Sequence, residues 1–112
     1  MDIEFTDLSG VTRAALAGRL DTANVNQGEA DFVEKLASEG RPVVIDLSAV
    51  SFIASLGIRM LLSTARGLSR AGARVALYGA TPLVLEIIET TALDEIIPVA
   101  ETEAEAVALV NG

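Results

Sequence analysis

Residues 43–62, VVIDLSAVSFIASLGIRMLL, decide the fold of this chain. The run Val43-Val44-Ile45 consists of β-branched residues, which is typical of a central strand covered on both faces of a sheet. We expect this strand to occupy residues 42–47 and a loop to follow over residues 48–54. A helix is then expected over residues 55–70, because its apolar residues recur at the spacing i, i+3, i+4, i+7.

The segments on either side alternate between strand and helix. Residues 2–6 alternate apolar and polar side chains, and a turn at Ser9-Gly10 leads into a second strand. Thr81 and Pro82 supply an N-cap and a first helical residue, and the segment starting at Thr102 matches a capping box. The expected strands are residues 2–6, 11–20, 75–78 and 95–99, and the expected further helices are residues 24–38, 83–89 and 102–110.

The order of these elements predicts an α/β fold. Strands separated by helices imply right-handed crossovers and therefore a parallel portion of sheet. With the leading hairpin, we expect a mixed β-sheet of four to five strands flanked by about four helices. The 112 residues suffice for one domain and not for two, so a single domain over residues 1–112 is expected. The helix at residues 24–38 has poor helix formers near its start, Asn26 and Gly28, and Gly40 ends it.

Composition excludes several kinds of chemistry. The chain has no histidine, cysteine or tryptophan, which excludes histidine-dependent serine hydrolases, cysteine nucleophiles and zinc sites built on Cys and His. No Walker or Rossmann glycine pattern and no acidic metal-binding loop is present, so no cofactor or metal is expected. The net charge of −8 argues against direct binding of nucleic acid. Without a membrane span, a signal peptide or cysteine, the expected location is the cytoplasm.

Three stretches together resemble the STAS family of anti-sigma factor antagonists. The first runs from Asp46-Leu47-Ser48 through an aromatic residue to Ser55-Leu56-Gly57-Ile58 at the start of a helix. The second is Gly72 to Pro82, which is similar to that family's next strand and helix. The third, Gly18-Arg19-Leu20-Asp21, is similar to the family's lead into its first helix.

The resemblance implies a binding switch at Ser55. In the family, the serine at this position is phosphorylated by a partner kinase that is itself an anti-sigma factor, and a PP2C-type phosphatase removes the phosphate. The unmodified form binds the anti-sigma factor and releases the sigma factor. In this sequence Ala54 and Leu56 flank the serine, where the family commonly has an acid and a second hydroxyl. A helix N-terminus can accept a phosphate, although a serine there could also serve only as an N-cap.

A partner surface is expected along the helix that begins at Ser55. If Ile58, Leu61, Leu62 and Ala65 face the sheet, a stripe of apolar and small residues lies on the far side and suits a partner helix. The stripe consists of Leu56, Met60, Ser63 and Gly67. Three arginines, Arg59, Arg66 and Arg70, run beside the stripe; alternatively, the stripe packs under a neighbouring loop. The residues expected to contact a partner are Asp21, Asp46, Ser48, Ala54, Leu56, Gly57, Arg59, Met60, Ser63 and Gly67.

The two aspartates in this set have other possible roles. Asp46 could orient the Ser55 hydroxyl, although an acid at the end of a strand more often fixes a loop through backbone N–H groups. Asp21 could cap a turn or helix. An enzyme using Asp46 and Asp21 as acid and base is the least favoured hypothesis. The main alternative to the switch is a STAS-like subunit bound to the ATPase of a lipid transporter. The resemblance suggests a monomer when no partner is bound.

Overall fold

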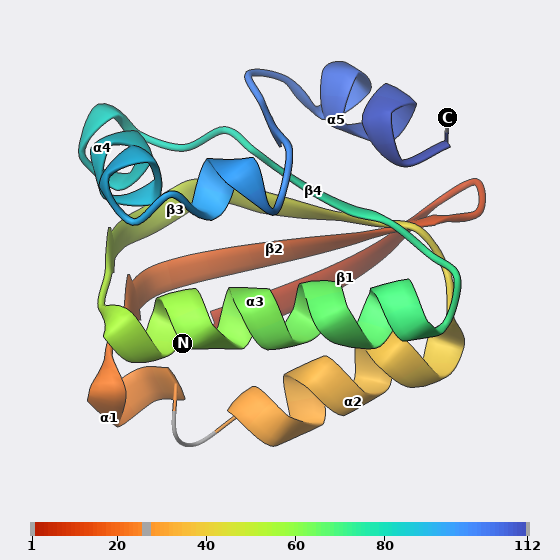
Figure 1. Cartoon of the computed structure of the whole chain (residues 1–112), viewed down its shortest axis with the longest axis horizontal. Helices are drawn as coiled ribbons and strands as arrows, with labels where there is room; N and C mark the ends of the chain where they lie inside the picture. The colour runs from red at the N-terminus through yellow and green to blue at the C-terminus, as the bar shows by residue number, and fades with distance from the viewer. Residues whose placement is uncertain (1, 26–27, 112) are drawn as a thin grey trace.

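The structure, a computed structural model, describes residues 2–25 and 28–111. Five strands form one sheet in the order β1-β2-β3-β4-β5, with β1 and β2 antiparallel and the remaining pairs parallel (Figure 1). The strands are β1 (Asp2–Leu8), β2 (Val11–Leu20), β3 (Val43–Ile53), β4 (Val75–Tyr78) and β5 (Val99–Ala100). The helices are α1 (Thr22–Val25), α2 (Glu29–Glu39), α3 (Ser55–Arg70), α4 (Pro82–Thr90) and α5 (Glu103–Asn111), with a short 3-10 helix, η1 (Leu93–Glu95). The predicted mixed sheet with a leading hairpin is confirmed.

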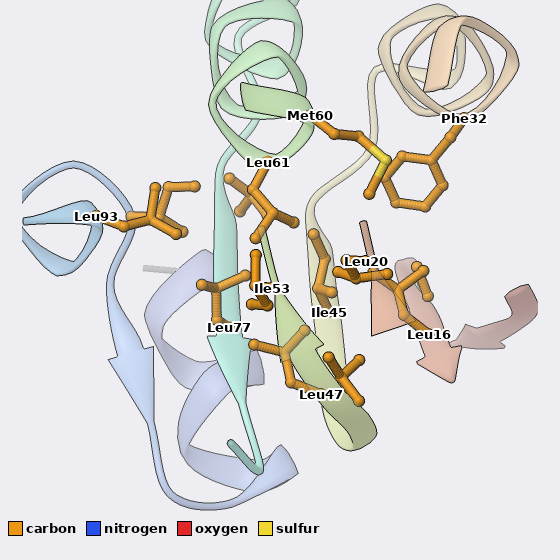
Figure 2. Close-up of a cluster of buried hydrophobic side chains, with 14 of the residues drawn as sticks. Leu16, Leu20, Phe32, Ile45, Leu47, Ile53, Met60, Leu61, Leu77 and Leu93 are labelled. Atoms are coloured by element: carbon orange, nitrogen blue, oxygen red, sulfur yellow. The ribbon is translucent and has the colours of Figure 1, made fainter. Parts of the chain in front are cut away.

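Two apolar clusters lie on opposite faces of the sheet. Helices α2 and α3 lie side by side on one face, and α5 covers part of the other (Figure 1). Alternation along β3 sends Ile45 and Leu47 into the larger cluster and Val44 into the smaller one beneath α5. Helix α4 and η1 complete the larger cluster; for example, Leu93 packs with Leu61 and Leu77 (Figure 2). Complete burial of one such leucine contributes about 2 kcal/mol.

Strand β3 is longer than the sequence predicted. The prediction ended the strand at Leu47 and placed a loop over residues 48–54, whereas β3 continues to Ile53. The reason is the length of β2, because its last residues pair with the extension of β3: Leu20 lies opposite Ile53. Val50 and Ile53 face the larger cluster, while the small residues Ser48, Ala49 and Ser51 hide the strand pattern.

Two other predictions need correction. The single helix predicted over residues 24–38 is instead two helices, α1 and α2, and Asn26 lies outside the described residues. The strand predicted over residues 95–99 is confined to Val99–Ala100, because the preceding segment turns as a 3-10 helix that buries Leu93 and Ile97. By contrast, α4 and α5 begin where predicted, with the hydroxyls of Thr81 and Thr102 accepting hydrogen bonds from helix N–H groups.

Candidate functional site

Ser55 is the first residue of α3 and follows β3 after a single intervening residue. That residue, Ala54, is extended and occupies the N-cap position, and its carbonyl accepts the first helical hydrogen bond from the Ile58 N–H at 3.1 Å. The alternative reading of Ser55 as the N-cap is therefore wrong. The Ser55 side chain is exposed, and because Ser55 is already the first helical residue, its hydroxyl is not at the N-cap position. The N–H groups of the first helical turn, to which Ser55 belongs, have no acceptors within the helix.

Gly57 fixes the start of α3 against the end of β2. A Cβ atom on this buried residue would lie 2.7 Å from the Leu20 carbonyl oxygen and 2.9 Å from the Ile53 Cγ2. The backbone approaches so closely here that only glycine fits. In addition, the Ala54 N–H donates to the same Leu20 carbonyl at 2.9 Å. Gly57 was predicted to contact a partner; instead it is buried and holds Ser55 in place.

Charged and aromatic side chains surround this end of the sheet. The Arg19 guanidinium lies 4.5 Å from the centre of the Phe52 ring, and its Nε lies 3.2 Å from the Asp21 carboxylate. Asp21 immediately precedes α1, and its carbonyl accepts from the Val25 N–H. The predicted residues Asp21, Ala54, Leu56 and Arg59 thus belong to the same end of the molecule as Ser55.

One turn along α3, Arg59 extends into solvent toward α2. Its Nε lies 3.6 Å from the Glu29 carboxylate, and it stands four positions after Ser55 in the helix. Residues spaced by four lie on the same side of a helix. Glu29, like Arg19 and Phe52, was not identified from the sequence. The pairing of Arg19 with Phe52 would have followed from the parallel register, but only if β3 had been extended to Ile53.

The predicted contact stripe on α3 is largely covered by α2. Met60 is fully buried and directed toward Phe32 of α2 (Figure 2). Gly67 faces α2 too, since a Cβ there would lie 3.1 Å from the Cβ of Ala37. Met60 and Gly67 therefore hold two helices together and are not available to a partner, whereas Leu56 and Ser63 are half-buried. The helical wheel failed because it omitted α2, which occupies the flank that was assigned to solvent.

Asp46 belongs to a separate polar network in the middle of β3. Its Oδ2 lies 2.6 Å from Arg13 Nη2, and its Oδ1 accepts from the Ser48 hydroxyl at 2.7 Å and the Ser48 N–H at 2.9 Å. Arg13 also donates to the Tyr78 hydroxyl at 2.9 Å. Burial by itself would raise the pKa of Asp46, but the hydrogen bonds from Ser48 and Arg13 outweigh it and leave that pKa lowered. Burial raises the pKa of Tyr78.

This position rules out the role predicted for Asp46 beside Ser55. Strand β3 continues for seven residues beyond Asp46, which places the carboxylate roughly 20 Å from the start of α3. The structural role, fixing Ser48 through its N–H, is the one observed. Asp46 and Asp21 do not form an acid–base pair either, because Asp46 lies opposite Ala15 of β2 and Asp21 follows the end of that strand.

The described part of the chain contains neither a metal-binding cluster nor a membrane-spanning helix. No group of three or more acidic side chains is placed to hold a metal ion in residues 2–25 and 28–111. Within the same ranges, no helix combines the length and the apolar character that crossing a bilayer requires.

Comparison with known proteins agrees with the fold. The STAS domain sequence profile matches residues 2–106. A Bordetella bronchiseptica protein assigned as an anti-sigma factor antagonist, BtrV, is 31% identical over 108 residues, which cover 96% of this chain and 93% of that protein. The crystal structure of an anti-sigma factor antagonist from Mycobacterium paratuberculosis has a TM-score of 0.88 at 26% identity and covers 99% of this chain and 94% of its own.

A further solved structure resembles this one in fold alone. The Bacillus cell fate determinant SpoIIAA, in its phosphorylated form, has a TM-score of 0.69 at 22% identity, covering 96% of this chain and 97% of its own. The profile match extends over nearly the whole sequence and includes both the strand β3 and the helix α3 that position Ser55. The chain belongs to the STAS domain family.

Proposed function

We propose that this protein is an anti-sigma factor antagonist whose binding to its partner is controlled by phosphorylation of Ser55. The observation that carries the proposal is the state of Ser55: an exposed hydroxyl in the first turn of a helix, with no capping role. BtrV and the mycobacterial protein, both described as anti-sigma factor antagonists, support the antagonist part of the proposal. SpoIIAA supports it as well, because that protein has the same fold with phosphate attached.

The local physics favours a change in binding over a change in folding. A phosphate on Ser55 adds a charge of about −1.5 to −2 beside the free N–H groups and the positive end of the α3 dipole. Arg59 lies on the same side of the helix one turn later, and its exposed side chain forms one ion pair within residues 2–25 and 28–111, with the half-buried Glu29. From there it can turn to the phosphate. The fold therefore tolerates the modification, while a partner docked at this end meets added bulk and negative charge.

The surface that changes is the end of the sheet around Ser55. In the unmodified protein this surface presents Arg19 stacked on Phe52, the Asp21 carboxylate and Arg59 beside the serine. The proposed partner is an anti-sigma factor with serine kinase activity, which needs access to the same hydroxyl. A PP2C-type phosphatase would restore the binding form. The proposal assigns the protein to the cytoplasm, as a monomer when no partner is bound.

Affinity capture from the native cells tests this function. The baits are the unmodified protein, Ser55→Ala, Ser55→Glu, and Ser69→Glu as a matched control that adds the same charge to an exposed serine at the far end of α3. We expect an ATP-binding protein of the serine kinase type on every bait except Ser55→Glu. Retention of that partner by Ser55→Glu would contradict the switch. Capture of a transporter ATPase, equal on all four baits, would identify a transporter subunit instead.

A further inference from the structure

A cavity of about 600 Å³ opens at the ends of β4 and β5, beside α4 and η1. Its apolar lining comes from Ala80, Val99, Ala100 and Leu85. The volume lies within the usual range for ligand-binding pockets. The cavity follows the two strands at the opposite side of the sheet from β1, whereas Ser55 follows β3 (Figure 1). None of the residues that line the cavity belongs to the surface around Ser55.

Three carboxylates line the same cavity: Glu89 of α4, Asp94 of η1, and Glu101. None of the three is in an ion pair within residues 2–25 and 28–111. The sequence explains why. The last basic residue of the chain is Arg74, and residues 75–112 contain seven acids and no lysine or arginine.

Five acids elsewhere in the described residues do form ion pairs: Asp7, Asp21, Glu29, Glu39 and Asp46. Each of the five ion pairs joins residues between Asp7 and Arg59. A smaller cavity beside β1 makes the contrast direct, because its acids are paired there: Asp7 with Arg41, and Glu39 with Lys35 at 3.1 Å. The cavity at the ends of β4 and β5 instead combines an apolar lining with three carboxylates that lack a cationic partner among the described residues.

The acidic part of the chain after Arg74 also carries exposed apolar side chains outside the cavity. Of the five large hydrophobic side chains that are exposed in the described structure, four lie in the same acidic part of the chain. They are Leu83, Leu85, Ile96 and Leu109. Leu83 and Leu85 both belong to α4, and Leu85 lines the cavity. An occupant must therefore satisfy negative charge and cover apolar surface at once.

From this combination we infer that the cavity binds a short cationic and apolar segment of a partner protein. Within the described residues, the carboxylates do not converge on a point that could hold a metal ion. A ligand that neutralises them must therefore carry its positive charge at more than one position. An arginine or lysine has an apolar stem that can lie on Leu85 and Val99, and a cationic head that reaches the rim. Leucine-like neighbours in the segment cover the exposed side chains of α4. The cavity is a second docking surface, which operates whether or not Ser55 carries phosphate.

Titration of the ¹⁵N-labelled full chain with a short acetylated peptide of alternating arginine and leucine tests this inference. We expect the amide signals of Gly79, Ala80 and Ala100 to shift and saturate, and a glutamate–leucine peptide to leave them in place. The triple variant Glu89→Gln/Asp94→Asn/Glu101→Gln should weaken binding by on the order of tenfold. Leu85→Ser should weaken it as well, because the apolar lining is lost.

Two controls separate a specific site from general attraction to an acidic protein. Glu4→Gln/Asp31→Asn/Glu34→Gln changes the net charge equally at three exposed acids outside the cavity and should leave the affinity within about twofold. Ser55→Glu should also leave it unchanged. The inference is overturned if the peptide does not bind, if the control triple variant weakens binding as much as the cavity variant, or if the shifts centre on α2 and β1. The spectrum of each free variant shows that it is folded.

Discussion

Asp46 and Ser55 lie nine residues apart on one strand–helix segment, yet their surroundings differ in every respect. Asp46 is buried in the middle of β3, and both of its carboxylate oxygens are occupied by Arg13 and Ser48. Ser55 is exposed at the start of α3 and has no capping partner. A buried polar group is hydrogen-bonded within the fold, whereas an exposed polar group that the fold does not need can bind another molecule. Substitutions should therefore affect stability at one position and binding at the other.

The largest effect on stability should come from Gly57, which joins the two regions. Gly57→Ala forces a methyl group against the Leu20 carbonyl, and we expect the free energy of unfolding to fall by about 3 kcal/mol. Urea denaturation measures this. Gly67→Ala is the matched control on the same helix, where the nearest atom is the more distant Cβ of Ala37; its effect should stay below about 1 kcal/mol. Equal stability of Gly57→Ala and the unmodified protein would show that the start of α3 is not fixed in this way.

Asp46→Asn should have the next largest effect. The substitution keeps the shape of the side chain but removes the charge that Arg13 and Ser48 stabilise, and we expect a loss of about 1.5 kcal/mol at neutral pH. Asp31→Asn, at an exposed acid of α2, serves as the control and should change stability by less than about 0.5 kcal/mol. A partner that binds at Ser55 should bind Asp46→Asn normally. Impaired binding by a folded Asp46→Asn protein would contradict the separation of the two regions.

The dependence of stability on acid pH should distinguish Asp46→Asn from the unmodified protein. The pKa of Asp46 in the folded state is lowered from 3.8, so its contribution to stability is present above that value and is lost as the pH falls through the lower pKa of the folded state. Thermal unfolding followed from pH 5 toward about pH 2 should therefore show a smaller loss of stability for Asp46→Asn than for the unmodified protein. Parallel curves for the two proteins would mean that Asp46 is not stabilised in its charged form.

The smallest effect on stability is expected at Ser55 itself. Ser55→Ala removes an exposed hydroxyl without a capping bond and should change the free energy of unfolding by less than about 0.5 kcal/mol. Ser55→Glu places a negative charge at the helix N-terminus and should raise it by about 0.5 kcal/mol at low ionic strength. Chemical denaturation of both variants provides the measurement. A loss above about 1.5 kcal/mol in either variant would show that Ser55 supports the fold and does not differ from Asp46 in this respect.

The two regions also differ in how well the sequence predicted them. Ser55 at the start of a helix followed from local signals, namely the apolar spacing of α3 and the glycine two residues later. The position of Asp46 in the middle of a strand did not follow from local signals. It depends on where β3 ends, and that end is set by pairing with β2, which is distant in sequence. The polar and small residues Ser48, Ala49 and Ser51 resemble a loop, although they lie on the exposed side of a paired strand.

The packing between α2 and α3 could not be predicted from the sequence either. The spacing of apolar residues on α3 indicated one buried face, but Met60 and Gly67 are covered by α2, which no local pattern of α3 reveals. The partners of Arg19 and Arg59 were missed for the same reason, since Phe52 and Glu29 come from other elements. In contrast, the acidic and base-free stretch after Arg74 could have been found by counting charges along the chain.

Mapping of phosphate by peptide mass spectrometry, on protein taken from its native cells under several growth conditions, tests the central claim most directly. The account predicts phosphate on Ser55, in a proportion that changes with growth condition, and none on the half-buried Ser63 of the same helix. Ser55 without phosphate under every condition, or a phosphate confined to another residue, would contradict it.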